Sequence, residues 1–279
     1  MKSAYGFIRF DTHDEFKTWL KNKGVSRVVN KLQVHHTGSP SYSNFYKSNG
    51  THEDELTRQN NMKSFHVNSR GMSDIAQHFT VFPNGRIVTG RSLNSNPAGI
   101  TGWNSNAICV EIYGNFDKGC DIMTTAQKDA VIMLYGELCK KFRLTPSTST
   151  IRPHAWFTSG GTYLGDYIAG RSRKTCPGTN FMGFGNRTDG FKKFIALVAN
   201  YINGNTTVSQ APTTNTVGVY KVIVDELNIR KGPGTSYAVA GVVHKGEAYT
   251  ITQLSGSWGK LKSGAGWINC SSKYCTKVR

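Results

Sequence analysis

The sequence predicts a mixed α/β domain, with a central sheet flanked by helices, followed by a small all-β barrel. Strand-like and helix-like segments alternate up to residue 202. The next stretch, NGNTTVSQAPTTNTV at 203–217, is polar and uncharged, which is typical of a flexible linker. Short β-like runs separated by glycines follow it, as in small barrels. We therefore expect domains at 1–202 and 218–279, joined by a linker at 203–217.

The elements of the first domain follow from local patterns. Apolar runs at 31–38 (KLQVHHTG) and 107–116 (AICVEIYGNF) predict buried strands. Residues 78–90 alternate around a Pro-Asn-Gly sequence, which predicts a hairpin. Residues 124–142 predict the clearest helix, capped by one of its first two threonines, and 188–202 predict a second amphipathic helix. In the second domain the β-like runs are YKVIV, LNIR, VAGVVH, AYTITQL, WGKLK and GWINC.

Net charge narrows the class of partner. The 279 residues include 34 Lys and Arg against 17 Asp and Glu, a net charge of +17. Such an excess predicts an anionic partner: a nucleic acid, an acidic membrane or an anionic wall polymer. Because there is no dense basic block and no nucleic-acid motif, we expect no nucleic-acid ligand. No apolar run approaches the roughly 18–20 residues needed to cross a bilayer, so we expect no membrane insertion.

The first 16 residues carry charges where a signal peptide needs an apolar core. We therefore expect synthesis in the cytoplasm without a secretion signal. The six cysteines are too few and too scattered for a disulfide scaffold. Cys109 and Cys139 lie in apolar contexts and are expected in the core. Spacing alone does not decide whether Cys270 and Cys275 pair.

Five residues carry candidate chemistry. His35, His154 and Cys176 each leave or follow a strand-like run, and two imidazoles with a thiolate make a catalytic zinc site whose fourth position is open to water. Glu111 interrupts the apolar run ICVEIY, where a carboxylate could take a proton from such a water. Lys174 could hold an oxyanion. Spacing alone leaves the non-catalytic alternatives open: structural histidines, an outward-facing glutamate and a solvated lysine.

The first ~200 residues resemble the type-2 N-acetylmuramoyl-L-alanine amidases, which have the peptidoglycan-recognition-protein fold. The matching segments, in the family's order, are VHHTG, GMSDIAQHFTVFPNGRIVTGR (71–91), NSNAICVEIYGNF (104–116) and KTCPG. The resemblance implies zinc bound by His35, His154 and Cys176. It also implies Glu111 as the catalytic glutamate and Lys174 as the catalytic lysine.

The sequence departs from the family pattern at two places. Gln77 stands where many members have a tyrosine, and 21 residues separate the last two ligands. We expect the insert at 155–175 to form part of the substrate groove wall, with Trp156 and Tyr163 as candidates for stacking or for the core. His36 is the alternative first ligand. Two further histidines in family-like stretches, His66 and His78, are expected to be structural.

Residues 227–269 resemble a bacterial SH3 domain through LNIRKGPGTSY, KGE, SWGKL and GWIN. Such domains bind peptidoglycan cross-bridges or stem peptides. Tyr237, Trp258 and Trp267 are candidates for this contact or for the small core.

Together the two resemblances imply an endolysin from a phage or prophage of a Gram-positive host. It would cleave the amide between N-acetylmuramic acid and L-alanine, lyse the cell, and reach the wall through a membrane lesion made by another protein. One alternative is a non-catalytic peptidoglycan receptor on the same fold, against which the cysteine ligand argues. Another is a basic nucleic-acid-binding protein, suggested by charge alone. A third is hydrolysis of a different bond, such as a peptide link in the stem.

Overall fold

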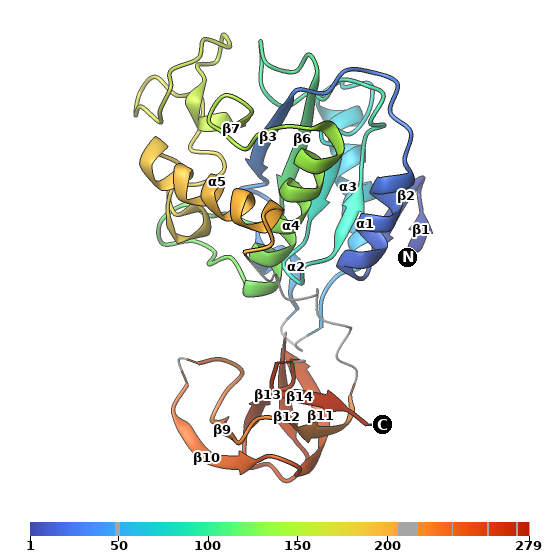
Figure 1. The fold of residues 1–279 in the computed structure, drawn as a ribbon, viewed down its shortest axis with the longest axis vertical. Helices are drawn as coiled ribbons and strands as arrows, with labels where there is room; N and C mark the ends of the chain where they lie inside the picture. Colours follow the sequence, from blue (N-terminus) through green and yellow to red (C-terminus); the bar gives the residue numbers. More distant parts are fainter. Residues whose placement is uncertain (48–50, 206–216, 236, 256, 272, 279) are drawn as a thin grey trace. The chain divides into compact units, whose positions relative to one another are not determined.

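The computed structural model describes residues 1–47, 51–205, 217–235, 237–255, 257–271 and 273–278. It contains two compact units, each with its own sheet and its own core (Figure 1). Residues 206–216 of the predicted linker lie outside the described residues, so the linker and the domain boundaries stay predictions. Within the described ranges, no helix is both long and apolar enough to cross a membrane.

The first unit is built on a seven-stranded mixed sheet. Its strands are β1 (Lys2–Ala4), β2 (Phe7–Phe10), β3 (Lys31–His36), β4 (Phe79–Val81), β5 (Ile87–Thr89), β6 (Ala107–Ile112) and β7 (Ile151–Pro153). Its α-helices are α1 (His13–Asn22), α2 (Tyr42–Phe45), α3 (Glu55–Ser64), α4 (Thr125–Phe142) and α5 (Thr188–Ile202). The strand order is β1-β2-β5-β4-β6-β3-β7; β4, β6, β3 and β7 are parallel, and the other neighbours are antiparallel.

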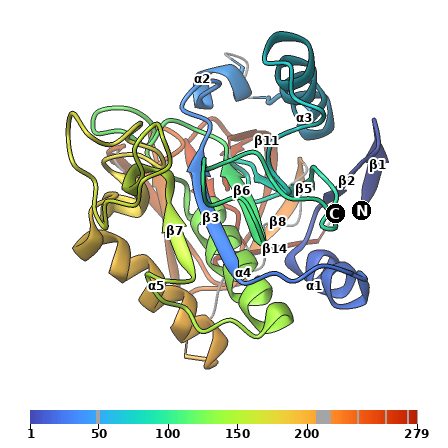
Figure 2. The same cartoon turned by 90° about the horizontal axis from the view of Figure 1, so that it is seen from above.

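Helices cover both faces of this sheet. Helices α1, α4 and α5 lie on one side and α2 and α3 on the other (Figure 2). Because strand side chains alternate between faces, Leu32 and Val34 of β3 join one core cluster with the buried residues of α1 and α4. Gln33 and His35 point to the opposite face. The layered arrangement confirms the predicted α/β class.

Local sequence explains where α4, the longest helix, begins and ends. Thr124 caps α4, its side chain accepting a hydrogen bond from the Gln127 backbone N–H at 3.1 Å. The helix ends at Arg143, which adopts a left-handed conformation with φ of 55°. Helix α5 covers the predicted range 188–202. Both helices therefore match the prediction.

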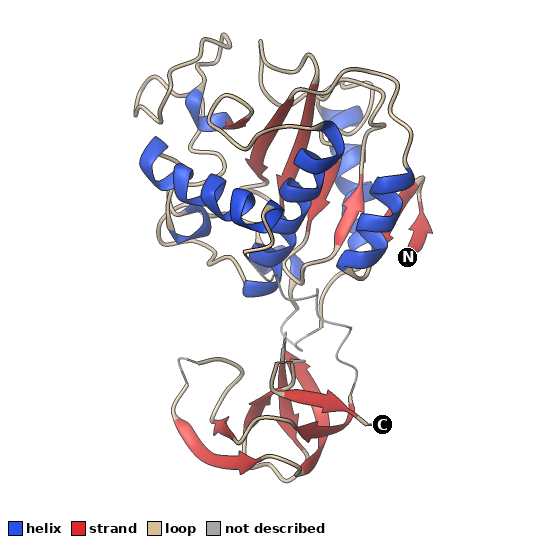
Figure 3. Ribbon diagram, in the orientation of Figure 1, coloured by secondary structure: helices blue, strands red, loops and turns tan. Residues whose placement is uncertain are grey.

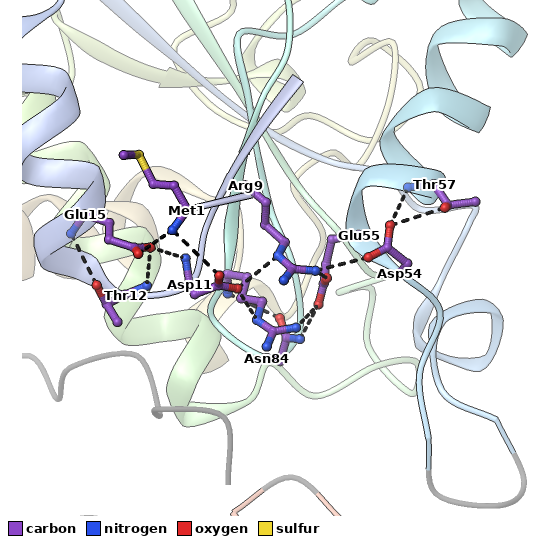
Figure 4. A network of polar contacts seen from close by, with 10 residues as sticks. Met1, Arg9, Asp11, Thr12, Glu15, Asp54, Glu55, Thr57 and Asn84 are labelled. Atoms are coloured by element: carbon purple, nitrogen blue, oxygen red, sulfur yellow. Dashed lines mark hydrogen bonds and ion pairs between the residues drawn. The ribbon is translucent and has the colours of Figure 1, made fainter. Parts of the chain in front are cut away.

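A buried ionic network fixes the start of α3 to the sheet (Figure 4). The fully buried Glu55 carboxylate accepts hydrogen bonds from Arg9 Nη1 at 2.8 Å, Arg86 Nη1 at 2.9 Å and Asn84 Nδ2 at 2.6 Å. Asp11 contacts both guanidinium groups, at 2.9 and 3.1 Å. Because a buried charge is costly unless it is paired, these contacts tie α3 to β2 and to the β4–β5 hairpin.

The described residues of the second unit form strands and no α-helix (Figure 3). The strands are β8 (Gly218–Val222), β9 (Glu226–Arg230), β10 (Val239–His244), β11 (Ala248–Ser255), β12 (Trp258–Leu261), β13 (Trp267–Asn269) and β14 (Cys275–Lys277). All pairs are antiparallel, in the order β10-β9-β13-β12-β11-β8-β14. Alternate residues, among them Leu227, Ile229 and Ile268, form the core. This confirms the expected all-β region.

Candidate metal centre

Three candidate ligands come together where parallel strands end. The carboxyl ends of β3, β6 and β7 meet at one edge of the sheet, the usual place for a site in an open α/β fold. His35 lies near the end of β3, and His154 begins a short 3₁₀ turn directly after β7. Cys176 is held beside them because its carbonyl accepts a hydrogen bond from the Ala155 backbone N–H at 2.7 Å.

The three side chains form one buried group. The ligand atoms of His35, His154 and Cys176 all lie within 4.8 Å of one another. His35 Nδ1 lies 3.6 Å from the Cys176 sulfur, and the two imidazole rings are 5.0 Å apart between centroids. The side chains are 4, 7 and 3% exposed. Two nitrogens and a sulfur at this spacing fit the donor set of a catalytic zinc site with one open position.

Burial sets the protonation states of the three groups. It lowers the pKa of His35 well below 6.5 and that of His154 to about 4, with help from the positive charge of Lys174. Both imidazoles are therefore neutral at pH 7, the form that can bind a metal. Burial and the nearby Glu111 raise the pKa of the Cys176 thiol. A bound cation would have to stabilise its thiolate.

Glu111 and Lys174 flank the three candidate ligands in different ways. Glu111 pairs in register with His35 on β3 and with Thr80 on β4, so its side chain lies on the same face of the sheet as His35. Burial raises the pKa of Glu111 to about 7, and the charge of Lys174 opposes that rise. Lys174 is exposed. A carboxyl group with a near-neutral pKa therefore lies on the same sheet face as His35, within reach of the positive charge of Lys174.

Three other histidines in the family-like stretches use their ring nitrogens in the fold. His36 Nδ1 accepts a hydrogen bond from the Phe116 backbone N–H at 3.1 Å, and within the described residues His36 does not belong to the group that could hold a metal. His78 accepts from the Cys109 backbone N–H and contacts the Ser95 carbonyl, both at 2.9 Å. His66 Nδ1 accepts from the backbone of residue 76 at 3.2 Å. These contacts agree with structural roles and do not favour His36 as a ligand.

The two aromatic candidates of the insert behave differently. Trp156 is fully buried, and its indole N–H donates to the Asn186 carbonyl at 2.8 Å, so it belongs to the core. Tyr163 is 42% exposed. The Arg152 guanidinium lies over its ring, 3.8 Å from the ring centroid, and 5.1 Å from the ring centroid of Trp103. Tyr163 therefore remains the candidate for a wall of the groove.

Gln77 contacts Thr80, the residue of β4 that is in register with Glu111. Its side chain is buried, and Nε2 donates to Thr80 Oγ1 at 3.0 Å. Its Oε1 has no hydrogen-bond partner among the described residues. Gln33, which sequence reasoning did not identify, lies closer to the candidate ligands: its Oε1 is 3.3 Å from His35 Nε2. The sequence signal for it is a polar residue inside the apolar strand LQVHH.

In the second unit, Tyr237 is 47% exposed, while Trp258 and Trp267 are partly buried. Cys270 and Cys275 are both buried, with free thiols. Cys109 and Cys139 are buried in the first unit, which confirms their predicted place in its core.

Comparison with known proteins identifies both parts of the chain. A family profile described as N-acetylmuramoyl-L-alanine amidase matches residues 25–179, and a bacterial SH3 domain profile matches 225–275. Peptidoglycan-recognition protein SC2 of Drosophila melanogaster is 27% identical over 125 residues, covering 45% of this chain and 59% of that protein. The putative N-acetylmuramoyl-L-alanine amidase YrvJ of Bacillus subtilis is 35% identical over 84 residues, covering 28% of this chain and 16% of that protein.

Among solved structures, the amidase LysC from Clostridium intestinale has 22% identity and a TM-score of 0.39, covering 63% of this chain and 92% of that one. Drosophila PGRP-LB has 20% identity and a TM-score of 0.42, covering 56% of this chain and 78% of that one. The chain thus spans only part, at most 59%, of the curated relatives named above.

Proposed function

This chain belongs to the N-acetylmuramoyl-L-alanine amidase family, and from that premise we propose that it hydrolyses the amide between the lactyl group of N-acetylmuramic acid and L-alanine in peptidoglycan. The observation that carries the proposal is the buried group of His35, His154 and Cys176, with Glu111 beside it on the same sheet face. A non-catalytic receptor would have no use for this combination.

The donor set suits zinc. Two neutral imidazoles and one thiol, all buried and within 4.8 Å of one another, are borderline-soft ligands of the kind this ion prefers. His35, His154 and Cys176 would hold it. When bound, zinc supplies a Lewis acid for the scissile carbonyl and lowers the pKa of a coordinated water.

Glu111 and Lys174 supply the proton transfer and the charge stabilisation. With a pKa of about 7, Glu111 can remove a proton from the attacking water and later pass it to the leaving amine. Lys174, exposed at the rim, can place its ammonium group against the oxyanion that develops on the lactyl carbonyl. The water-derived oxygen ends on the lactyl carboxylate, and the transferred proton ends on the alanine amine.

We propose that the second unit holds the enzyme on the wall. It matches a bacterial SH3 domain, and residues 218–279 carry nine basic and three acidic residues. Both parts of the chain are basic, which supports attraction to anionic wall polymers. Tethering to peptidoglycan would raise the effective concentration of the amidase unit at its substrate.

We further propose that the protein is the endolysin of a phage or prophage of a Gram-positive host. It would be made in the host cytoplasm and released through a membrane lesion, after which amide cleavage lyses the cell. Finding the protein in the medium of intact, growing cells would contradict this route.

The amidase proposal is tested by digesting purified Gram-positive sacculi and assaying new alanine amino termini and new reducing sugar ends in parallel. We expect alanine amines without reducing ends. New amino termini from other stem residues would indicate a different scissile bond. Neither product, from protein shown to contain zinc, would favour the receptor.

A further inference from the structure

A buried glutamine contacts the ring nitrogen of His35 that does not face the Cys176 sulfur. Gln33 lies two residues before His35 on β3, and the two side chains share one face of the sheet. Gln33 is 0% exposed. Its Oε1 lies 3.3 Å from His35 Nε2, while His35 Nδ1 faces the Cys176 sulfur at 3.6 Å. The two ring nitrogens of His35 therefore meet two different partners.

The surroundings of Gln33 fix which way its amide points. Its Nε2 donates to the Trp103 carbonyl at 3.0 Å and to Asn104 Oδ1 at 3.1 Å. Asn104 Oδ1 is itself identified as the oxygen, because it accepts the backbone N–H groups of Gly99 and Ile100, both at 2.9 Å. The opposite orientation of Gln33 would set its oxygen against two acceptors. Oε1 therefore has to face His35.

An oxygen at that place decides the tautomer of His35. The Gln33 oxygen can only accept, so His35 Nε2 must carry the ring proton. Nδ1 is then left with its lone pair, directed towards the sulfur of Cys176. That is the form in which a neutral imidazole binds a metal, and a hydrogen bond to the other ring nitrogen is how proteins orient such ligands.

The backbone of Gly99 packs so closely against the Gln33–His35 hydrogen bond that a side chain at this position would clash with it. A β-carbon built on Gly99 would lie 2.1 Å from Gln33 Oε1 and 2.9 Å from His35 Nε2. The loop from residue 99 to residue 104 thus closes tightly over the Gln33–His35 hydrogen bond and also supplies the acceptors that orient Gln33.

We propose that Gln33 is a positioning residue, oriented by Asn104, that holds His35 in the Nε2-protonated tautomer and so presents Nδ1 for zinc. This deepens the proposed function and rests on it. Gln33 would then affect the zinc affinity of the protein and the tautomer of His35, and both can be measured without substrate.

The first test compares zinc affinity, using zinc ions and a competing chelator, in the wild type and in Gln33→Leu. Loss of an outer-shell partner typically weakens metal affinity about 10- to 100-fold, and we expect a loss in this range. Gly99→Ala, which keeps Gln33 but displaces its oxygen, should weaken affinity in the same direction. Asn104→Asp keeps the accepting oxygen and should stay within about threefold of the wild type.

Gln127→Leu is the matched control. Gln127 is also 0% exposed, and its amide donates to two carbonyls, those of Val81 and Tyr113, at 2.8 and 2.9 Å. It should lower thermal stability about as much as Gln33→Leu does, yet leave zinc affinity within about threefold of the wild type. Equal losses of zinc affinity in the two leucine variants would overturn the proposal, because they would reflect general loosening of the fold.

The second test reads the tautomer directly. In zinc-free wild-type protein labelled with ¹⁵N-histidine, NMR should place the His35 proton on Nε2, and Gln33→Leu should give a mixture of tautomers. A proton on Nδ1 in the wild type would overturn the proposal whether or not zinc binds. A wild type that carries the proton on Nε2 and binds zinc, yet produces no new alanine amino termini in sacculi, would instead contradict the proposed function and leave the role of Gln33 standing.

Discussion

Replacing Glu111 by Gln should inactivate the enzyme while making the metal-free protein more stable. The substitution keeps the shape of the side chain and removes the carboxylate that we propose takes the proton. A general base contributes about 10²- to 10⁴-fold to the rate, which corresponds to about 3–5 kcal/mol in the barrier. We expect a loss of turnover in this range with zinc content unchanged.

The gain in stability follows from burial. Burial raises the pKa of Glu111 from 4.5 to about 7, so the fold disfavours the ionised carboxylate. Above pH 7 the Glu111 carboxylate is ionised in the unfolded chain without that penalty. The difference between its pKa in the folded and unfolded states therefore corresponds to a loss of at most about 3 kcal/mol in the free energy of unfolding. Since the side chain is only partly buried, we expect Glu111→Gln to raise the free energy of unfolding of the zinc-free protein by about 1–3 kcal/mol at pH 8. The gain should shrink to below about 1 kcal/mol at pH 5.

The assay pairs two measurements on the same preparations. The appearance of new alanine amino termini in sacculi gives the rate, and denaturant unfolding in the presence of a chelator gives the stability. A variant that is both inactive and less stable than the wild type would refute the assignment, because Glu111 would then be part of the framework. A variant that retains a tenth or more of the wild-type rate would refute its role as the base.

Four further predictions concern other parts of the molecule. Cys176→Ala should lose both zinc and activity, as metal analysis and the sacculus assay would show; full zinc content would contradict its place among the ligands. Glu55→Gln leaves the buried Arg9 and the partly buried Arg86 short of a carboxylate and should cost about 3 kcal/mol in denaturant unfolding, whereas Asp189→Asn, in an exposed ion pair, should leave the free energy of unfolding nearly unchanged. Burial lowers the pKa of His13 to about 4, so its stabilisation is complete above pH 6.5 and is lost as the pH falls to 4; the wild type should lose up to about 3 kcal/mol more than His13→Phe over that window, and equal losses would show that His13 is not the group responsible. Sedimentation with cell walls should decline steeply from low to high salt, and binding that is insensitive to salt would contradict the role of charge.

The fold was predictable where local pattern and tertiary packing agree. Helices at 124–142 and 188–202 present apolar faces and good boundaries, and the structure has them at those positions. Helix α3 gave no such signal, because it buries Glu55 and Gln59 as well as apolar residues and is fixed by ionic contacts. Strands β1, β2 and β7 have only three or four residues, too few for a periodic pattern.

Some residues of the candidate site were also predictable from the sequence, and others were not. The residue types and order of His35, His154 and Cys176 predicted a common site, and the structure brings the three together at one end of the parallel strands. Trp156 could not be separated from Tyr163 by sequence, because its burial depends on contacts with distant segments such as Asn186. Gln33 was missed because its role depends on Asn104, 71 residues along the chain, which turns its amide towards His35.

The most direct test of the zinc site is X-ray absorption at the zinc edge of the purified, fully loaded wild-type protein. We expect one sulfur ligand at about 2.3 Å together with two imidazoles and one further light atom. The sulfur contribution should vanish in Cys176→Ala. A wild-type spectrum with no sulfur, or with fewer than two imidazoles, would contradict zinc binding by His35, His154 and Cys176.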